Sequence, residues 1–151
     1  IKSALVAYGH YLSFMFCFGA LIFERFNLKV DANRKETISL IIADVIYGLA
    51  GIALLISGIL RVRYFGQGTE YYIHNPVFWI KIGIFIFVGL LSLYPTFTYI
   101  LWAIPIIKGD LPKVSSNLVS RLQLIVNIEL IGFSSIPLFA ALMARGIGIN
   151  Y

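Results

Sequence analysis

The sequence predicts an all-α integral membrane protein, built as an up-and-down bundle of four helices. Of its 151 residues, 60% are hydrophobic and only 13% are charged, a composition typical of membrane proteins. Four apolar runs are each long enough to cross a bilayer, and short polar links join them. Since only helices and closed barrels satisfy their backbone in lipid, continuous runs of this length indicate helices.

The expected helices form a single domain over residues 1–151 and cover residues 3–23, 38–60, 77–103 and 118–144. The first run ends at Glu24 without a small-residue cleavage pattern, so we expect a retained helix and not a signal peptide. Short links make consecutive helices antiparallel neighbours. Seven basic residues lie in or beside the first and third links, whereas four lie at the termini and in the second link. This asymmetry predicts that both termini lie outside the cytoplasm.

In the second helix a stripe of mostly small residues falls along one line at helical spacing. The stripe consists of Asp44, Gly48, Gly51, Leu55 and Gly58. It predicts close approach of another helix, with the carboxyl group of Asp44 inside the bundle.

Prolines interrupt the two later helices. Pro95 and Pro105 predict a kinked or irregular inner end of the third helix. Pro137 has the same effect in the fourth, where Ser134 or Ser135 could satisfy the carbonyl groups that it frees.

Two nitrogen bases lie within the apolar runs. His10 is in the first helix, and Lys81 is near the start of the third. Because these helices run in the same direction, both side chains are expected at one depth. Together they could ligate iron from opposite faces of a haem. The alternatives are a histidine hydrogen-bonded to a neighbouring helix and a lysine that snorkels to the surface.

The second link is basic and aromatic. Arg61, Arg63 and His74 are expected near the membrane surface, where an interfacial belt of such residues is common. Alternatively the two guanidinium groups could bind haem propionates. His74 is the second histidine that a bis-histidine site would require.

A second set of polar residues is expected toward the cytoplasmic side. The predicted buried network consists of Glu24, Asp44, Tyr94, Arg121 and Glu129. Arg121 is expected to pair with Asp44, since a carboxylate in the membrane needs a partner. Glu129, near the midplane, is expected to be protonated or bonded to Tyr47 or Asn127, either as a proton relay or as a neutral lock between helices.

Several classes of function find no support. The basic residues lie in membrane links, so nucleic acid is not an expected partner. Phosphate-binding, metalloprotease and dithiol motifs do not occur, and Cys17 is the only cysteine. The thiol, thioether and imidazole groups show no clustered spacing that would favour copper.

Four motifs together carry a resemblance to known proteins. They are DVIYGLAGIALLISGILRVRYFGQG, HNPVFWIKIG, LLSLYPT and LFAALMARGIG. With them nearly the whole chain resembles a small family of bacterial and cyanobacterial four-helix membrane proteins of unknown function. That family is distantly similar to HemJ-type protoporphyrinogen oxidases and to CopD copper-resistance membrane proteins.

The HemJ-type resemblance implies haem b bound by a first-helix histidine and a third-helix lysine after a tryptophan. His10 and the segment Trp79–Lys81 match these places. The resemblance thus implies a haem protein of the plasma or thylakoid membrane, with a HemJ-like oxidoreductase activity as one expectation. The rival hypothesis is an accessory subunit of a photosynthetic or respiratory complex, or a homo-oligomer. Such a protein would contact membrane lipids. It would bind chlorophyll, carotenoid or lipid between its helices, or it would bind no cofactor.

Overall fold

The computed structural model describes residues 1–148, and within that range its secondary structure consists of helices joined by short links, without strands. The elements are α1 (Lys2–Asn27), α2 (Arg34–Leu60), the π-helical turn η1 (Arg61–Phe65), α3 (Thr69–Ile73), α4 (Pro76–Ile107) and α5 (Ser116–Ala144). The four long helices are each long and apolar enough to cross a membrane, with η1 extending α2. The predicted all-α membrane fold is therefore confirmed.

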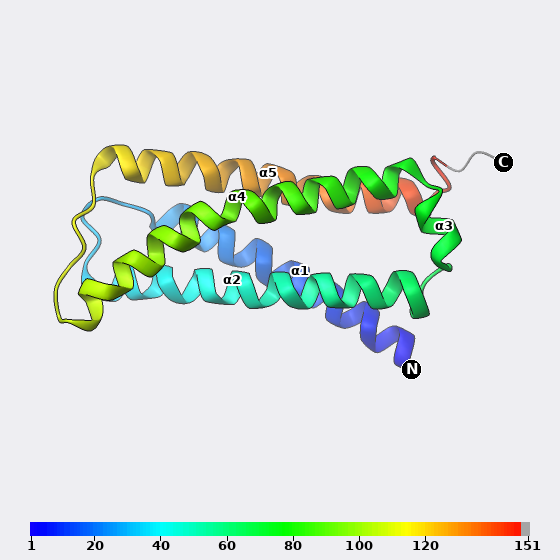
Figure 1. The fold of residues 1–151 in the computed structure, drawn as a ribbon, viewed down its shortest axis with the longest axis horizontal. Coiled ribbons are helices and arrows are strands. Elements are labelled where there is room, and N and C mark those ends of the chain that lie inside the picture. Colours follow the sequence, from blue (N-terminus) through cyan, green and yellow to red (C-terminus); the bar gives the residue numbers. More distant parts are fainter. Residues whose placement is uncertain (149–151) are drawn as a thin grey trace.

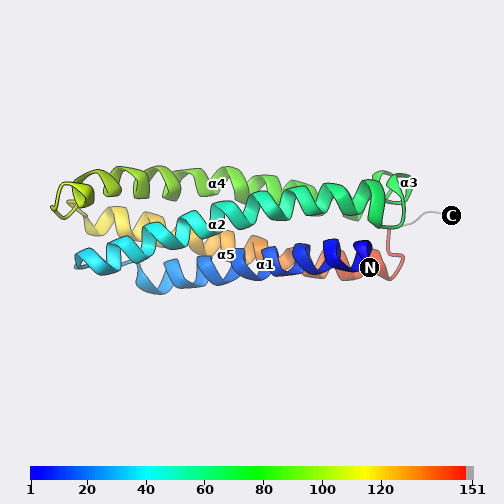
Figure 2. The same cartoon turned by 90° about the horizontal axis from the view of Figure 1, so that it is seen from below.

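The helices form a four-cornered bundle (Figures 1 and 2). α1 packs most extensively on α2, and α4 on α5, while contacts of α2 with α4 and of α1 with α5 close the ring. The chain starts at the end of the bundle that also carries α3, and the other two links lie at the opposite end (Figure 1). We call the first end the terminal end and the second the link end.

Polar caps place the helix starts outside the apolar runs. The side chain of Asn33 accepts a hydrogen bond from the backbone of Glu36 (3.0 Å), and the Glu36 carboxylate accepts one from the backbone of Asn33 (2.8 Å). This capping box starts α2 at Arg34, four residues before the predicted start at residue 38. Ser115 caps α5 in a similar way, through a bond from the backbone of Leu118 (3.2 Å).

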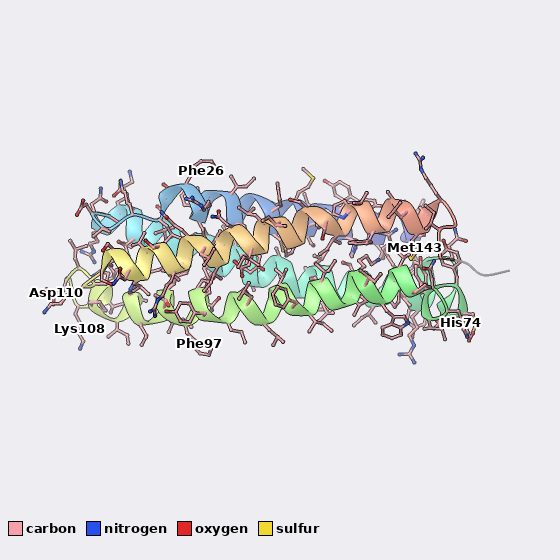
Figure 3. All side chains as sticks on the ribbon, turned by 90° about the horizontal axis from the view of Figure 1, so that it is seen from above. Phe26, His74, Phe97, Lys108, Asp110 and Met143 are labelled. Atoms are coloured by element: carbon pink, nitrogen blue, oxygen red, sulfur yellow. The ribbon has the colours of Figure 1, made fainter. Side chains whose placement is uncertain are left out.

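The bundle interior is apolar and tightly filled, and its outside is apolar too. Cys17, Leu40 and Leu122 are fully buried between helices. Phe26 and Phe97, labelled on the outside of the bundle in Figure 3, are 82% and 62% exposed. An aromatic outer surface of this kind suits lipid as its surroundings.

The prolines do not end the helices. α4 runs through Pro95 and Pro105 to Ile107, and α5 runs through Pro137. The expected serine bonds differ from the prediction. Ser134 donates to the carbonyl of Leu130 and Ser135 to that of Gly132, both at 2.7 Å. Neither serine therefore meets the carbonyl group four residues before Pro137, which is the one that the ring frees.

The stripe predicted on α2 is wrong as a packing face in its middle part, although Gly58 at its end does lie against His10 of α1. Gly48 and Leu55 lie on exposed positions, and no atom of another element lies within 4 Å of a Cβ built on Gly48 or Gly51. The buried face is turned slightly, and its residues are Thr37, Leu40, Ala43, Asp44, Tyr47, Ala50 and Leu54. Asp44 belongs to both faces, which is why its predicted burial is nevertheless correct.

The orientation in the membrane stays a prediction, and cysteine labelling can test it. A cysteine in place of Gln67, in the exposed link before α3, should react with an impermeant maleimide from the non-cytoplasmic side. Cys17 is fully buried, so the native thiol should give little background. A cysteine in place of Asp110, in the opposite link, is the matched control and should react from the cytoplasmic side. Labelling in the reverse sense would show that the bundle is inverted.

Candidate functional site

His10 lies in the seam between α1 and α2, near the terminal end. Its ring Nδ1 is 2.9 Å from the hydroxyl oxygen of Ser57. The ring also lies over Gly58, where an added Cβ would come within 3.4 Å of Cε1. The glycine therefore leaves room for the imidazole, and the serine fixes the orientation of its ring. A bond from this histidine to a neighbouring helix is what the alternative to a haem ligand predicted, and the structure agrees with that alternative.

Lys81 and Arg61, from two other elements, are the cations whose charges reach His10. Both cationic groups lie near enough for their charges to act on the imidazole. The Lys81 ammonium lies 5.4 Å from the centre of the Phe78 ring, and the Arg61 guanidinium lies 5.1 Å from that of Tyr11. We call His10, Arg61 and Lys81 the basic cluster. Its members come from α1, η1 and α4.

His74 and Arg63 do not belong to this cluster. His74 ends α3, and its ring Nδ1 is 3.2 Å from a carboxylate oxygen of Glu70, with its side chain 73% exposed. Arg63 is also exposed. The prediction of His74 as an axial ligand is therefore not supported by its position, because α3 holds it on the exposed link outside the bundle.

Three carboxyl groups lie in the bundle interior. Glu24, Asp44 and Glu129 are 1%, 7% and 1% exposed, and they come from α1, α2 and α5. The Tyr99 hydroxyl donates to Glu24 (3.3 Å) and the Thr96 hydroxyl donates to Asp44 (2.8 Å). We call the three carboxyl residues the acidic cluster. Glu129, predicted near the midplane, is near enough for electrostatic interaction with both of the others.

Two other members of the predicted network lie elsewhere. Arg121 is exposed on α5, and Tyr94 is 43% exposed on α4. The prediction of an Asp44–Arg121 pair is therefore wrong, because Arg121 points away from the interior beside the buried Leu122. Arg25, which follows Glu24 in the sequence, does not replace Arg121 as a partner. Its guanidinium group donates to the side chain of Asn127 (2.6 Å) and not to a carboxylate.

Sequence reasoning missed the two hydroxyl donors from α4. Tyr99 belongs to the buried row of that helix, whose members are Phe78, Val88, Ser92, Pro95, Tyr99, Trp102 and Ile106. The spacing of three or four residues along this row could have identified Tyr99 as an interior residue. Thr96 lies beside the row and is only partly buried.

A substitution pair can test the corrected partner of Asp44. Thr96→Val removes the donor while keeping the shape of the side chain, so the protein should lose about 1–3 kcal/mol of unfolding free energy. Arg121→Leu, on the exposed side, should change it by less than about 0.5 kcal/mol. Unfolding of the detergent-solubilised protein by sodium dodecyl sulfate measures both. An equal loss in the two variants would restore Arg121 as the partner.

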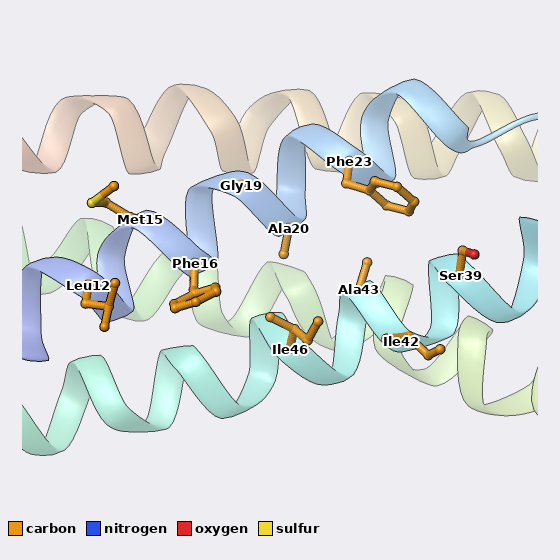
Figure 4. A pocket seen from close by; sticks show the side chains of 10 residues that line it. All are labelled: Leu12, Met15, Phe16, Gly19, Ala20, Phe23, Ser39, Ile42, Ala43 and Ile46. Atoms are coloured by element: carbon orange, nitrogen blue, oxygen red, sulfur yellow. The ribbon is translucent and has the colours of Figure 1, made fainter.

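An apolar groove runs along the outside of the α1–α2 seam (Figure 4). It has a volume of about 570 Å³. Its lining residues are Leu12, Met15, Phe16, Gly19, Ala20, Phe23, Ser39, Ile42, Ala43 and Ile46. Ser39 is the single polar residue among them, so the groove suits an elongated apolar molecule and offers no strong metal ligand. In residues 1–148 no three side chains of histidine, cysteine, aspartate or glutamate gather as a metal site requires.

Comparison with known proteins gives one family. Residues 2–148 match the family described as "Predicted membrane protein (DUF2214)". No curated protein matches the chain, and no solved structure matches it. The resemblance to a four-helix membrane family is thus confirmed, while the more distant similarity to HemJ-type and CopD proteins finds no support. Since the match covers nearly its whole length, the chain belongs to the DUF2214 family of predicted membrane proteins.

Proposed function

We propose that this membrane protein binds haem b through its basic cluster and takes part in redox chemistry. The observation that carries the proposal is the hydrogen bond between the His10 ring and Ser57 (2.9 Å). A histidine that ligates a metal almost always has its second ring nitrogen held by such a bond, which fixes the ring and its tautomer. Here Nδ1 is held, so Nε2 is the nitrogen left for a ligand.

The donor set of the cluster fits a haem. Imidazole and a neutral amine are both nitrogen ligands for iron, and His10 and Lys81 come from different helices. In the described part of the chain the ion pairs are Lys29–Glu36 and His74–Glu70, so no carboxylate there competes for Lys81. Arg61 could bind a propionate group bidentately. Bound haem b would supply one-electron redox chemistry.

The apolar groove is not the place for this haem. None of its lining residues is a histidine or lysine. The two proposed nitrogen ligands, His10 and Lys81, both belong to the basic cluster. The residues of the protein would therefore bind the iron, orient the ring through Ser57 and exclude water with the surrounding aromatic side chains.

Titration of the purified protein with haemin tests the proposal and the role of Ser57. The wild type should bind haemin with a saturable Soret shift. Ser57→Ala, which frees the imidazole to rotate, should weaken binding about 10- to 100-fold. Ser134→Ala is the matched control, because its hydroxyl bonds only to its own helix (2.7 Å), and it should bind as the wild type does. Equal affinities in all three proteins would remove the orienting role of Ser57, and no saturable shift in the wild type would refute haem binding.

A second candidate function is that of an accessory subunit with a pigment or lipid in its seam. The apolar groove between α1 and α2 favours it, since a long hydrophobic molecule would fill a space of about 570 Å³. Gly19→Leu would place a side chain in the groove, and nothing lies within 4 Å of a Cβ built there. Mass spectrometry of organic extracts should find a co-purifying molecule in the wild type and less of it in this variant. Identical extracts would argue against an occupied groove.

A further inference from the structure

The acidic cluster carries an inference that does not depend on haem. Its carboxyl groups come from three helices and are almost completely buried, with Glu24 in the last turn of α1 (Lys2–Asn27) and Glu129 at the centre of α5 (Ser116–Ala144). We propose that the acidic cluster is a proton-binding site, in which the Glu24 and Glu129 carboxyl groups bind and release protons within the membrane.

Hydrogen bonding leaves this site incomplete. One carboxyl oxygen of Glu24 and one of Glu129 (Oε1 in each) are buried and have no hydrogen-bond partner within residues 1–148. The Glu24 side chain receives one bond from Tyr99. An ionised carboxylate in this setting would lack most of the donors that it requires, at a cost of several kcal/mol. A bound proton removes the charge and makes each group a donor.

No cation in the described part of the chain compensates the three carboxyl groups. The two ion pairs found there, Lys29–Glu36 and His74–Glu70, both lie outside the cluster. Arg25 follows Glu24 directly, but its guanidinium group is bonded to Asn127. The basic cluster lies toward the terminal end, where its charges act on one another.

The other titratable groups that face the cluster are weak acids. Tyr47 comes from α2, Tyr99 from α4 and Cys17 from α1, while α5 contributes Glu129 itself. All three weak acids are neutral in their ordinary state at neutral pH. The positive charge that would balance an ionised Glu24 or Glu129 must therefore be taken up by the site, and a proton is the species that one carboxyl oxygen can hold.

A metal ion fits the site less well than a proton. A cation such as sodium or calcium requires several oxygen ligands at one point. The three carboxyl groups do not converge closely enough to make such a site in residues 1–148. Proton binding forms one O–H bond with a proton taken from water, and release returns the proton and leaves one carboxylate. The exchange needs no oxidant or reductant.

Infrared spectroscopy of the purified protein in lipid can test the inference. Carboxylic acids have a C=O stretching band that carboxylates lack, and the band shifts when water is replaced by deuterium oxide. The wild type should show such a band at neutral pH, and it should fall reversibly as the pH is raised. Glu129→Gln and Glu24→Gln should each remove part of it. Glu70→Gln, at an exposed residue on α3, is the matched control and should leave the band unchanged.

If a variant does not fold, isotope labelling of the glutamate carboxyl groups in the wild-type protein tests the same inference. In wild-type protein that carries carbon-13 in its glutamate side chains, the acid band should move by the isotope shift. Absence of a glutamate acid band at neutral pH would overturn the proposal. Loss of the band on addition of sodium or calcium chloride at constant pH would also overturn it, and would assign a metal-ion site.

Discussion

His10→Ala protein, expressed beside the wild type with ample haem supply, should lose the Soret band completely. The substitution removes the imidazole that Ser57 orients, and His74 cannot replace it because it is 73% exposed on α3 and paired with Glu70. Lys81→Ala should keep a Soret band at a shifted position, since His10 would remain as one ligand. Absorption spectra of the purified proteins, with haem counted per chain, measure both effects.

His74→Ala is the matched control for this experiment. It removes an imidazole from the exposed link, so its spectrum should equal that of the wild type. Circular dichroism should show the same helical content in all the variants, because the His10 side chain contributes one hydrogen bond to the α1–α2 seam. An unaltered haem spectrum in the His10→Ala protein would refute the assignment of His10 as a ligand.

Gly132→Leu should strongly destabilise the seam between α4 and α5. A Cβ on Gly132 would come within 2.5 Å of a methyl carbon of Val88, which is fully buried. Neither helix can move aside easily, because close-packed interiors transmit such strain. Overpacking of this kind costs about 1–3 kcal/mol, and a leucine side chain should reach the upper end of that range. Unfolding in sodium dodecyl sulfate should show the loss as an earlier midpoint.

Two further variants separate overpacking from a general effect of replacing glycine. Gly89→Ala adds a methyl group where nothing lies within 4 Å, so its midpoint should be equal to or later than that of the wild type. Val88→Ala introduced into the Gly132→Leu protein should recover part of the lost stability. A wild-type midpoint for Gly132→Leu alone would show that the two helices are not in close contact at this point.

The fold could be predicted from the sequence because lipid leaves few alternatives for apolar runs of this length. The four spans and their antiparallel order agree with the structure. The helix starts were less predictable, since polar caps such as Asn33 lie outside the apolar runs that define a span. The end of the third helix was also misjudged. It was predicted at residue 103, before Pro105, but the helix tolerates the proline ring and continues to Ile107.

Which residues face inward was harder to predict, because lipid removes the polarity contrast that marks a helix face in water. Leu54 and Leu55 are neighbours of identical type, yet they are 5% and 49% exposed. Polar residues indicate the inward face of a helix only where they are rare, as with Glu24 and His10. Arg121 shows the limit of this signal, since a basic residue near a helix end is satisfied at the membrane surface and needs no partner inside.

The reduced-minus-oxidised visible spectrum of the wild-type protein, purified after expression with ample haem, tests directly whether the protein binds haem b. We expect a Soret band with α and β bands after reduction, at about one haem per chain, because the basic cluster offers one set of nitrogen ligands. A spectrum that shows only the absorption of aromatic residues, from protein that is folded and fully helical, would contradict this expectation.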